Sequence, residues 1–74
     1  MTRFGLEQKL NSMYNNAEKG EKVSMIHLFG IMYAEEIKNC GVSTKDIAKG
    51  ANINESYGTE ISKGVKLSRY VRLK

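Results

Sequence analysis

Apolar side chains recur at helical spacing along most of the chain and predict four helices. The first stripe, in residues 4–17, is made by Phe4, Leu6, Leu10, Met13, Tyr14 and Ala17. Thr2 precedes this stripe and is a candidate N-cap residue. The polar tract that follows, residues 15–22, contains Gly20 and is expected to be the loop that ends the first helix.

A second helix is predicted for residues 25–39. Its main stripe is Ile26, Phe29, Tyr33, Ile37 and Cys40, and further apolar residues widen that stripe in its first half. A helix that is apolar nearly all round is either the centre of the domain or also faces a partner. Ser24 is the expected N-cap, and Gly41 stands where a left-handed residue ends a helix.

Two residues inside this second helix, Gly30 and His27, interrupt its apolar sequence. Gly30 costs about 1 kcal/mol relative to Ala in a helix, so we expect another helix to pass close to it. His27 is the only histidine of the chain, and without a companion ligand or base we expect it to have a structural role.

Residues 43–64 read as two short helices joined by a tight turn. Ser43 and Asp46 form a variant of the capping box at the start of the first, and Asn52 tolerates the positive φ of a turn. Asn54 is the expected N-cap of the second helix, over residues 54–63, which should stop at Gly64. Ala48 supplies a small residue at the helix crossing. The apolar residues expected to lock the pair to the core are Ile47, Ile53 and Ile61.

The last segment, residues 65–74, carries two periodicities. Val71 and Leu73 alternate with charged residues, as in a strand, whereas the three-residue spacing of Lys66, Arg69 and Arg72 suits a helix. We favour the extended interpretation. The predicted fold is therefore an all-α, four-helix single domain over residues 1–74 that contains a helix-turn-helix and ends in a short extended or strand-like C-terminal tail.

Residues 43–64 resemble the helix-turn-helix of phage repressors and Cro-like proteins. Ile47 and Ala48 follow Ser43 at the usual place, and Asn52 falls where that family usually has Gly. Gly58 departs from the pattern, because a branched apolar residue is usual in the middle of the recognition helix. The departure is expected to weaken the helix and remove a core contact, with Tyr57 packing in its place.

The whole chain also resembles a family of small, uncharacterised bacterial helix-turn-helix-like proteins. The stretches that carry this resemblance are IHLFGIMYAEEI and SYGTEISKGVKLSRYVRLK. The resemblance implies a fold and no particular activity.

Charge is distributed unevenly. Residues 1–42 hold five Lys/Arg and five Asp/Glu, whereas residues 43–74 hold seven and three, so the whole formal charge of +4 lies in the second half. A basic half beside a neutral half is typical of a polyanion-binding protein. Lys74 adds to the basic end of the chain.

These patterns predict a nucleic-acid-binding module, with duplex DNA as the expected target, of bacterial or phage regulatory type. Base contacts would come from Asn54, Ser56 and Thr59 at the start of the recognition helix. Phosphate contacts would come from Lys45, Lys49, Lys63, Lys66, Arg69 and Arg72. Glu55 and Glu60 lie on the same face and would repel phosphate.

Other classes of function receive little support. Cys40 and His27 are the only residues of their kinds, so neither a disulfide nor a zinc site is expected, and a lone cysteine suits a reducing cytoplasm. The chain lacks a phosphate-binding glycine loop and a membrane-spanning apolar run, so we expect no enzyme, cofactor, small-molecule substrate or membrane. The alternative function is a protein-interaction or homo-oligomerisation module without nucleic acid, and a homodimer would use the helix 25–39 surface.

Overall fold

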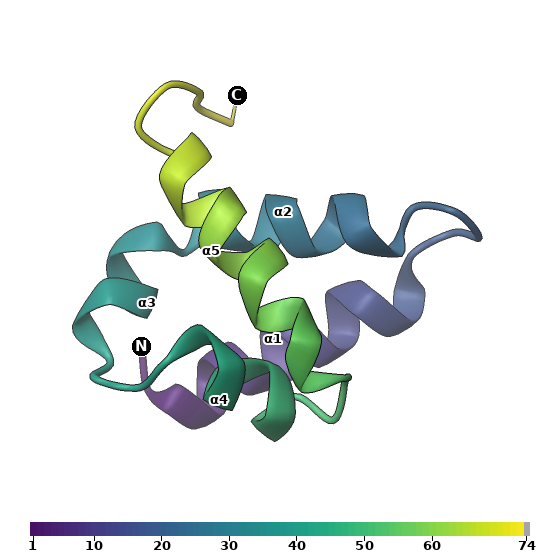
Figure 1. Ribbon diagram of the computed structural model, residues 1–74, viewed down its shortest axis with the longest axis horizontal. Helices are drawn as coiled ribbons and strands as arrows, with labels where there is room; N and C mark the ends of the chain where they lie inside the picture. The colour runs from purple at the N-terminus through teal and green to yellow at the C-terminus, as the bar shows by residue number, and fades with distance from the viewer. Residues whose placement is uncertain (74) are drawn as a thin grey trace.

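Five α-helices and one 3₁₀ turn make up the computed structural model, which describes residues 1–73 (Figure 1). The elements in order are α1 (Arg3–Asn16), α2 (Lys22–Met32), α3 (Ala34–Asn39), α4 (Thr44–Gly50), η1 (Glu55–Tyr57) and α5 (Gly58–Leu67). The all-α prediction is confirmed, but the expected number of helices is wrong. No helix within residues 1–73 is long and apolar enough to cross a membrane.

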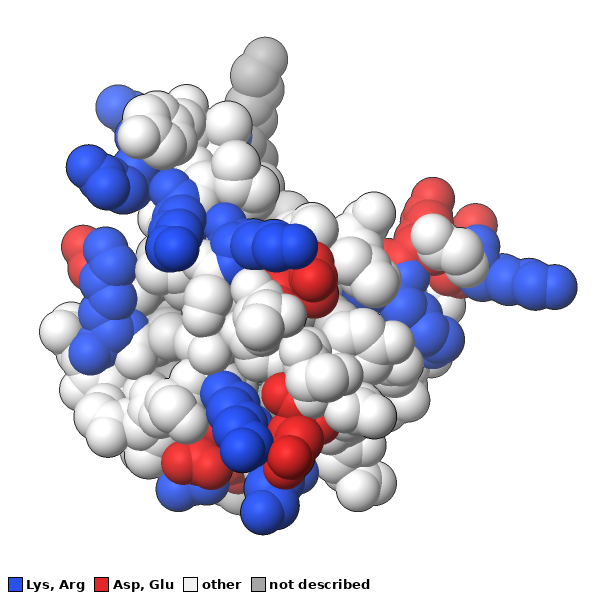
Figure 2. Space-filling view, viewed as in Figure 1, with Lys and Arg blue, Asp and Glu red and all other residues white. Residues whose placement is uncertain are grey.

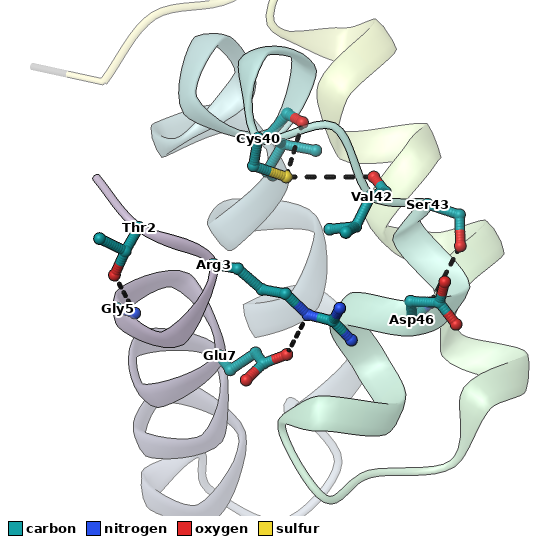
Figure 3. Close-up of polar contacts among 9 residues, drawn as sticks. Thr2, Arg3, Gly5, Glu7, Cys40, Val42, Ser43 and Asp46 are labelled. Carbon is teal, nitrogen blue, oxygen red and sulfur yellow. Dashed lines mark hydrogen bonds and ion pairs between the residues drawn. The ribbon is translucent and has the colours of Figure 1, made fainter.

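Helix α1 follows the prediction closely. The Thr2 hydroxyl accepts a hydrogen bond from the Gly5 N–H at 3.0 Å and so caps the helix, as expected (Figure 3). Leu6 and Leu10, two positions of its apolar stripe, are fully buried. They hold α1 against the central helix α2 and against α4.

The single helix predicted for residues 25–39 is in fact two helices. Tyr33 breaks it with φ −116° and ψ 25°, and α3 starts at the next residue. Phe29 and Ile37 are both buried in the same core. In a straight helix they would lie about 12 Å apart along the axis, whereas the turn at Tyr33 lets α3 fold back onto α5.

The expected start of that helix is also wrong. Helix α2 begins at Lys22, so Ser24 lies within its first turn and Glu21 occupies the N-cap without a side-chain cap. Gly41, by contrast, follows α3 with φ 79°, as predicted.

Helices α2 and α5 cross with their backbones in contact (Figure 1). A Cβ atom on Gly30 would lie 2.6 Å from the Ile61 carbonyl oxygen and 2.8 Å from the Gly64 Cα atom. The predicted close approach of a helix to Gly30 is therefore confirmed. The prediction that Gly64 ends its helix is wrong. Gly64 instead makes room for the backbone of α2 at this crossing.

The strand-like C-terminal tail is not observed. Helix α5 continues past Gly64 to Leu67, residues 68–70 form a turn, and residues 71–73 have no regular secondary structure. Lys66 therefore belongs to a helix. Lys74 lies outside the described residues.

Candidate nucleic-acid interface

Helix α4 is fixed at its start by a side-chain cap. The Ser43 hydroxyl accepts a hydrogen bond from the Asp46 N–H at 3.1 Å, as the capping pattern predicts (Figure 3). Ile47 and Ala48 then turn fully into the core. Arg3 on the neighbouring helix α1 extends toward α4, and its Nε donates a hydrogen bond to the Glu7 carboxylate at 2.8 Å (Figure 3).

The turn after α4 has the conformation that the sequence predicts. Asn52 has φ 64°, the only positive φ of a non-glycine residue within residues 1–73. The Ile53 N–H donates to the Ala48 carbonyl oxygen at 3.1 Å. Asn11, which the sequence did not single out, donates from its side-chain amide to the Ala51 carbonyl oxygen at 2.8 Å and so ties the turn to α1.

The second helix of the motif begins in two steps. The Asn54 side chain accepts a hydrogen bond from the Ser56 N–H at 2.9 Å, which confirms it as a cap, but the residues after it form the 3₁₀ turn η1. Helix α5 starts only at Gly58, so the predicted range 54–63 is too early at both ends. Tyr57 packs against Tyr14 on α1, with ring centroids 5.6 Å apart.

Gly58, which departs from the repressor pattern, lies in close contact with the backbone of α4. A Cβ atom at this position would lie 2.7 Å from the Lys45 backbone nitrogen and 2.8 Å from its Cα atom. The glycine therefore lets the start of α5 rest directly on the backbone of α4. The expectation that Gly58 only weakens the motif is wrong, since it sets the distance between the two helices.

The starts of α4 and α5 enclose a surface cavity of about 600 Å³, which we call the α4–α5 groove. Its lining residues are Thr44, Lys45, Asn54, Glu55, Ser56, Gly58, Thr59, Ser62, Lys63 and Lys66. Of the residues predicted to contact nucleic acid, the groove brings together Lys45, Asn54, Ser56, Thr59, Lys63 and Lys66.

The other three predicted residues lie elsewhere. Lys49 is exposed in the last turn of α4. The Arg69 guanidinium lies 5.9 Å from the Tyr70 ring centroid, beyond the end of α5. Arg72 lines a separate cavity of about 400 Å³, which it shares with Glu35 and Glu36 on α3.

The cations of the groove differ in their acidic neighbours. Lys45 lies 3.7 Å from Glu55, and Lys63 lies 3.3 Å from Glu60. Among the described side chains, no carboxylate lies within ion-pair distance of Lys66. Figure 2 agrees: basic side chains gather over the C-terminal half of α5 and the segment after it, while acidic ones lie beside the basic ones over α4.

Several polar side chains of the groove are already engaged within the protein. The Thr59 hydroxyl donates to the Ser56 carbonyl oxygen at 3.0 Å, and the hydroxyls of Thr44 and Ser62 are 3.0 Å apart. The side-chain oxygen of Asn54 is used as a cap. The bidentate contact to adenine that the sequence suggested for Asn54 needs this same oxygen, one of whose two lone pairs is already taken by the cap.

A further polar pair, which the sequence did not predict, lies beside the groove. His27 Nε2 on α2 lies 2.6 Å from Glu60 Oε1 on α5, and it donates because a carboxylate only accepts. Hydrogen bonds from His27 first and Lys63 second lower the pKa of the Glu60 carboxyl below its ordinary value. The one signal for this pair in the sequence is indirect: His27 and Glu60 each lie within a turn of a glycine at the α2–α5 crossing.

Comparison with known proteins agrees with this architecture. No curated protein and no solved structure matches the chain. A family model described as an HTH-like domain matches residues 5–74, which include all five α-helices except the first two residues of α1. A match of that extent takes in the capped α4, the Asn52 turn and α5 together with the helices that support them, and the chain therefore belongs to the HTH-like domain family.

Proposed function

We propose that the protein binds duplex DNA through the α4–α5 groove, with the start of α5 in the major groove. The observation that carries the proposal is the gathering of six predicted contact residues around this groove, on the exposed side of a helix-turn-helix. A helix-turn-helix places its second helix in the major groove while its first helix crosses the backbone.

The two sides of α5 suit this orientation. Ile61 and Gly64 are buried against the rest of the domain. Thr59, Lys63 and Lys66 are exposed on the opposite side and point into the α4–α5 groove. A helix about 10–12 Å in diameter fits a major groove about 12 Å wide.

Phosphate attraction would supply most of the affinity. Lys66 has no acidic neighbour to screen it among the described residues, and Lys63 lies one helical turn before it. Arg72, beside Glu35 and Glu36, would contribute less than the charge pattern suggested, and Lys49 lies outside the groove. We assign the protein a regulatory role of the phage-repressor or bacterial type in the cytoplasm, with no catalytic step.

Salt-dependent binding tests the proposal. Fluorescence anisotropy with a labelled duplex should show an affinity that falls linearly on a log–log plot against salt. The double variant K63Q/K66Q should reduce the slope by about 1.8, because each lost phosphate contact removes about 0.9.

The matched control is K9Q/K19Q, which removes the same charge from exposed positions on α1 and the following loop. It should leave the slope nearly unchanged. Absence of binding at low salt would refute the proposal, and an equal effect of both double variants would refute the assigned site.

A second candidate, a homodimer, is supported by exposed apolar side chains at the far end of α5. Met32 from α2 lies with Val71 and Leu73 around the cavity that Arg72 lines. Tyr70, next to this set, is 79% exposed. We propose that a dimer would use this end of the predicted helix 25–39 surface, which leaves the α4–α5 groove open. Sedimentation equilibrium should then show a dimer that M32K/V71K dissociates.

A further inference from the structure

His27, Glu60 and Lys63 form a chain of contacts that ends in the α4–α5 groove. His27 Nε2 donates to one carboxylate oxygen of Glu60 at 2.6 Å, and Lys63 Nζ donates to the other at 3.3 Å. Lys63 also lines the groove. The side chains of His27 and Glu60 are 31% and 21% exposed, so protons reach them from solvent.

We propose that His27 is a positioning residue that makes DNA binding depend on pH, by controlling how strongly Glu60 holds Lys63. The inference rests on the proposed function of the α4–α5 groove. While His27 is neutral, the Glu60 carboxylate is balanced by Lys63 alone. Once His27 is protonated, its own positive charge balances Glu60, and Lys63 is released to a phosphate.

The charge balance gives the direction of the effect. The three side chains carry a total charge of 0 with neutral His27 and +1 with protonated His27. Binding to a polyanion favours the more positive form, so DNA binding takes up a proton and tightens as the pH falls. Imidazole gains its proton between about pH 8 and pH 5, where few other side chains titrate.

Other ionisable groups near Glu60 come from η1, α1 and α2. Tyr57 on η1 packs against Tyr14 on α1, and its interaction with the Tyr14 side chain raises the pKa of Tyr57 above its ordinary value of 10.0. Lys22 on α2 lies 4.5 Å from the Tyr14 ring centroid. Among the described residues, α3 contributes no ion pair to His27 or Glu60.

The first test measures affinity for one duplex from pH 5.5 to pH 8 at fixed salt. The affinity of the unaltered protein should rise about fivefold toward low pH, the effect of a unit charge about 4 Å from a phosphate in water. H27Q keeps an amide donor for Glu60 without a titratable proton, so its profile should be flat. E60Q releases Lys63 at every pH and should bind as tightly at pH 8 as the unaltered protein does at pH 5.5.

A second test needs no DNA. Because His27 is the only histidine, its ring signals can be followed by NMR in the free protein. The side-chain signals of Glu60 and Lys63 should shift with the same midpoint as the ring, and those of Lys63 should not shift in H27Q. A Lys63 signal that ignores the His27 titration would overturn the inference even if DNA binds. Binding that is absent at every pH would instead refute the proposed function.

Discussion

The Cα atoms of Gly30 and Gly64 face each other where α2 and α5 cross, with no side chain between them. A Cβ atom on Gly30 would come within 2.8 Å of the Gly64 Cα atom, a separation that real Cβ atoms essentially never show. The obstacle is backbone, which cannot rotate away as a flexible side chain can. The crossing thus fixes the position of α5, and with it the position of the α4–α5 groove.

Substitution of either glycine should separate the two helices. We expect Gly30→Ala and Gly64→Ala each to lower the free energy of unfolding by about 3 kcal/mol, the upper part of the range for overpacking. Urea denaturation followed by circular dichroism measures the change. Gly5→Ala is the control, because the nearest atoms to its Cβ would be side-chain atoms of Met1 and Thr2 and not backbone. Equal losses in all three variants would contradict the importance of the crossing.

The two serines that the sequence proposed as caps should respond differently to substitution. Ser43→Ala removes the hydrogen bond to the Asp46 N–H and should cost about 1 kcal/mol of unfolding free energy. Ser24→Ala, inside the first turn of α2, should be neutral or stabilise by up to about 0.5 kcal/mol because alanine favours helix. Thermal and urea unfolding of the two variants side by side checks both values.

Acid should weaken the fold through Glu60. Its pKa is lowered in the folded protein by the hydrogen bond from His27 and then by that from Lys63, so the folded state favours the charged form. This stabilisation is complete above the unfolded pKa, near 4.5, and is lost as the pH falls through the lower folded pKa. E60Q should therefore lose less stability between pH 5 and pH 3 than the unaltered protein.

Urea denaturation at several pH values measures this effect. E18Q is the control, because Glu18 is exposed in the loop after α1. An acid dependence of E60Q as steep as that of E18Q would contradict the role of Glu60.

The groove should discriminate weakly between base pairs. Asn54, Thr59 and Ser62 are already hydrogen-bonded within the protein, which leaves few groups free to read base edges. We expect single base-pair changes in a bound duplex to alter the binding free energy by less than about 1 kcal/mol, below the usual range of about 1–3 kcal/mol. Competition with a panel of substituted duplexes measures this, and one position with a larger effect would identify a direct base contact.

Features that depend on neighbouring residues could be predicted from the sequence. The caps at Thr2, Ser43 and Asn54 and the positive φ of Gly41 and Asn52 follow from local backbone chemistry, and the structure has all of them. The part of the α4–α5 groove that lies at the start of the recognition helix could be predicted too, because the start of such a helix is a local feature.

Apart from the close approach of a helix to Gly30, features that depend on distant contacts could not be predicted. The break at Tyr33 follows from the need to bury Ile37 beside α5, and nothing in the residues around Tyr33 requires it. The continuation of α5 through Gly64 depends on α2, and the close fit of Gly58 depends on α4. The sequence predicts a helix end at Gly64 and a weakened helix at Gly58, whereas at both sites glycine permits contact between backbones.

The direct contact of Gly58 with the backbone of α4 also bears on how a complex would form. The contact with α4 and the hydrogen bond from Asn11 to the connecting turn leave the two helices of the motif little room to change their angle toward a partner. In a complex of the proposed kind the duplex would have to bend or change its groove width to fit. Sequences rich in flexible pyrimidine–purine steps deform at a lower energetic cost, so mechanical compliance of the DNA, more than the identity of its bases, would select the preferred sites.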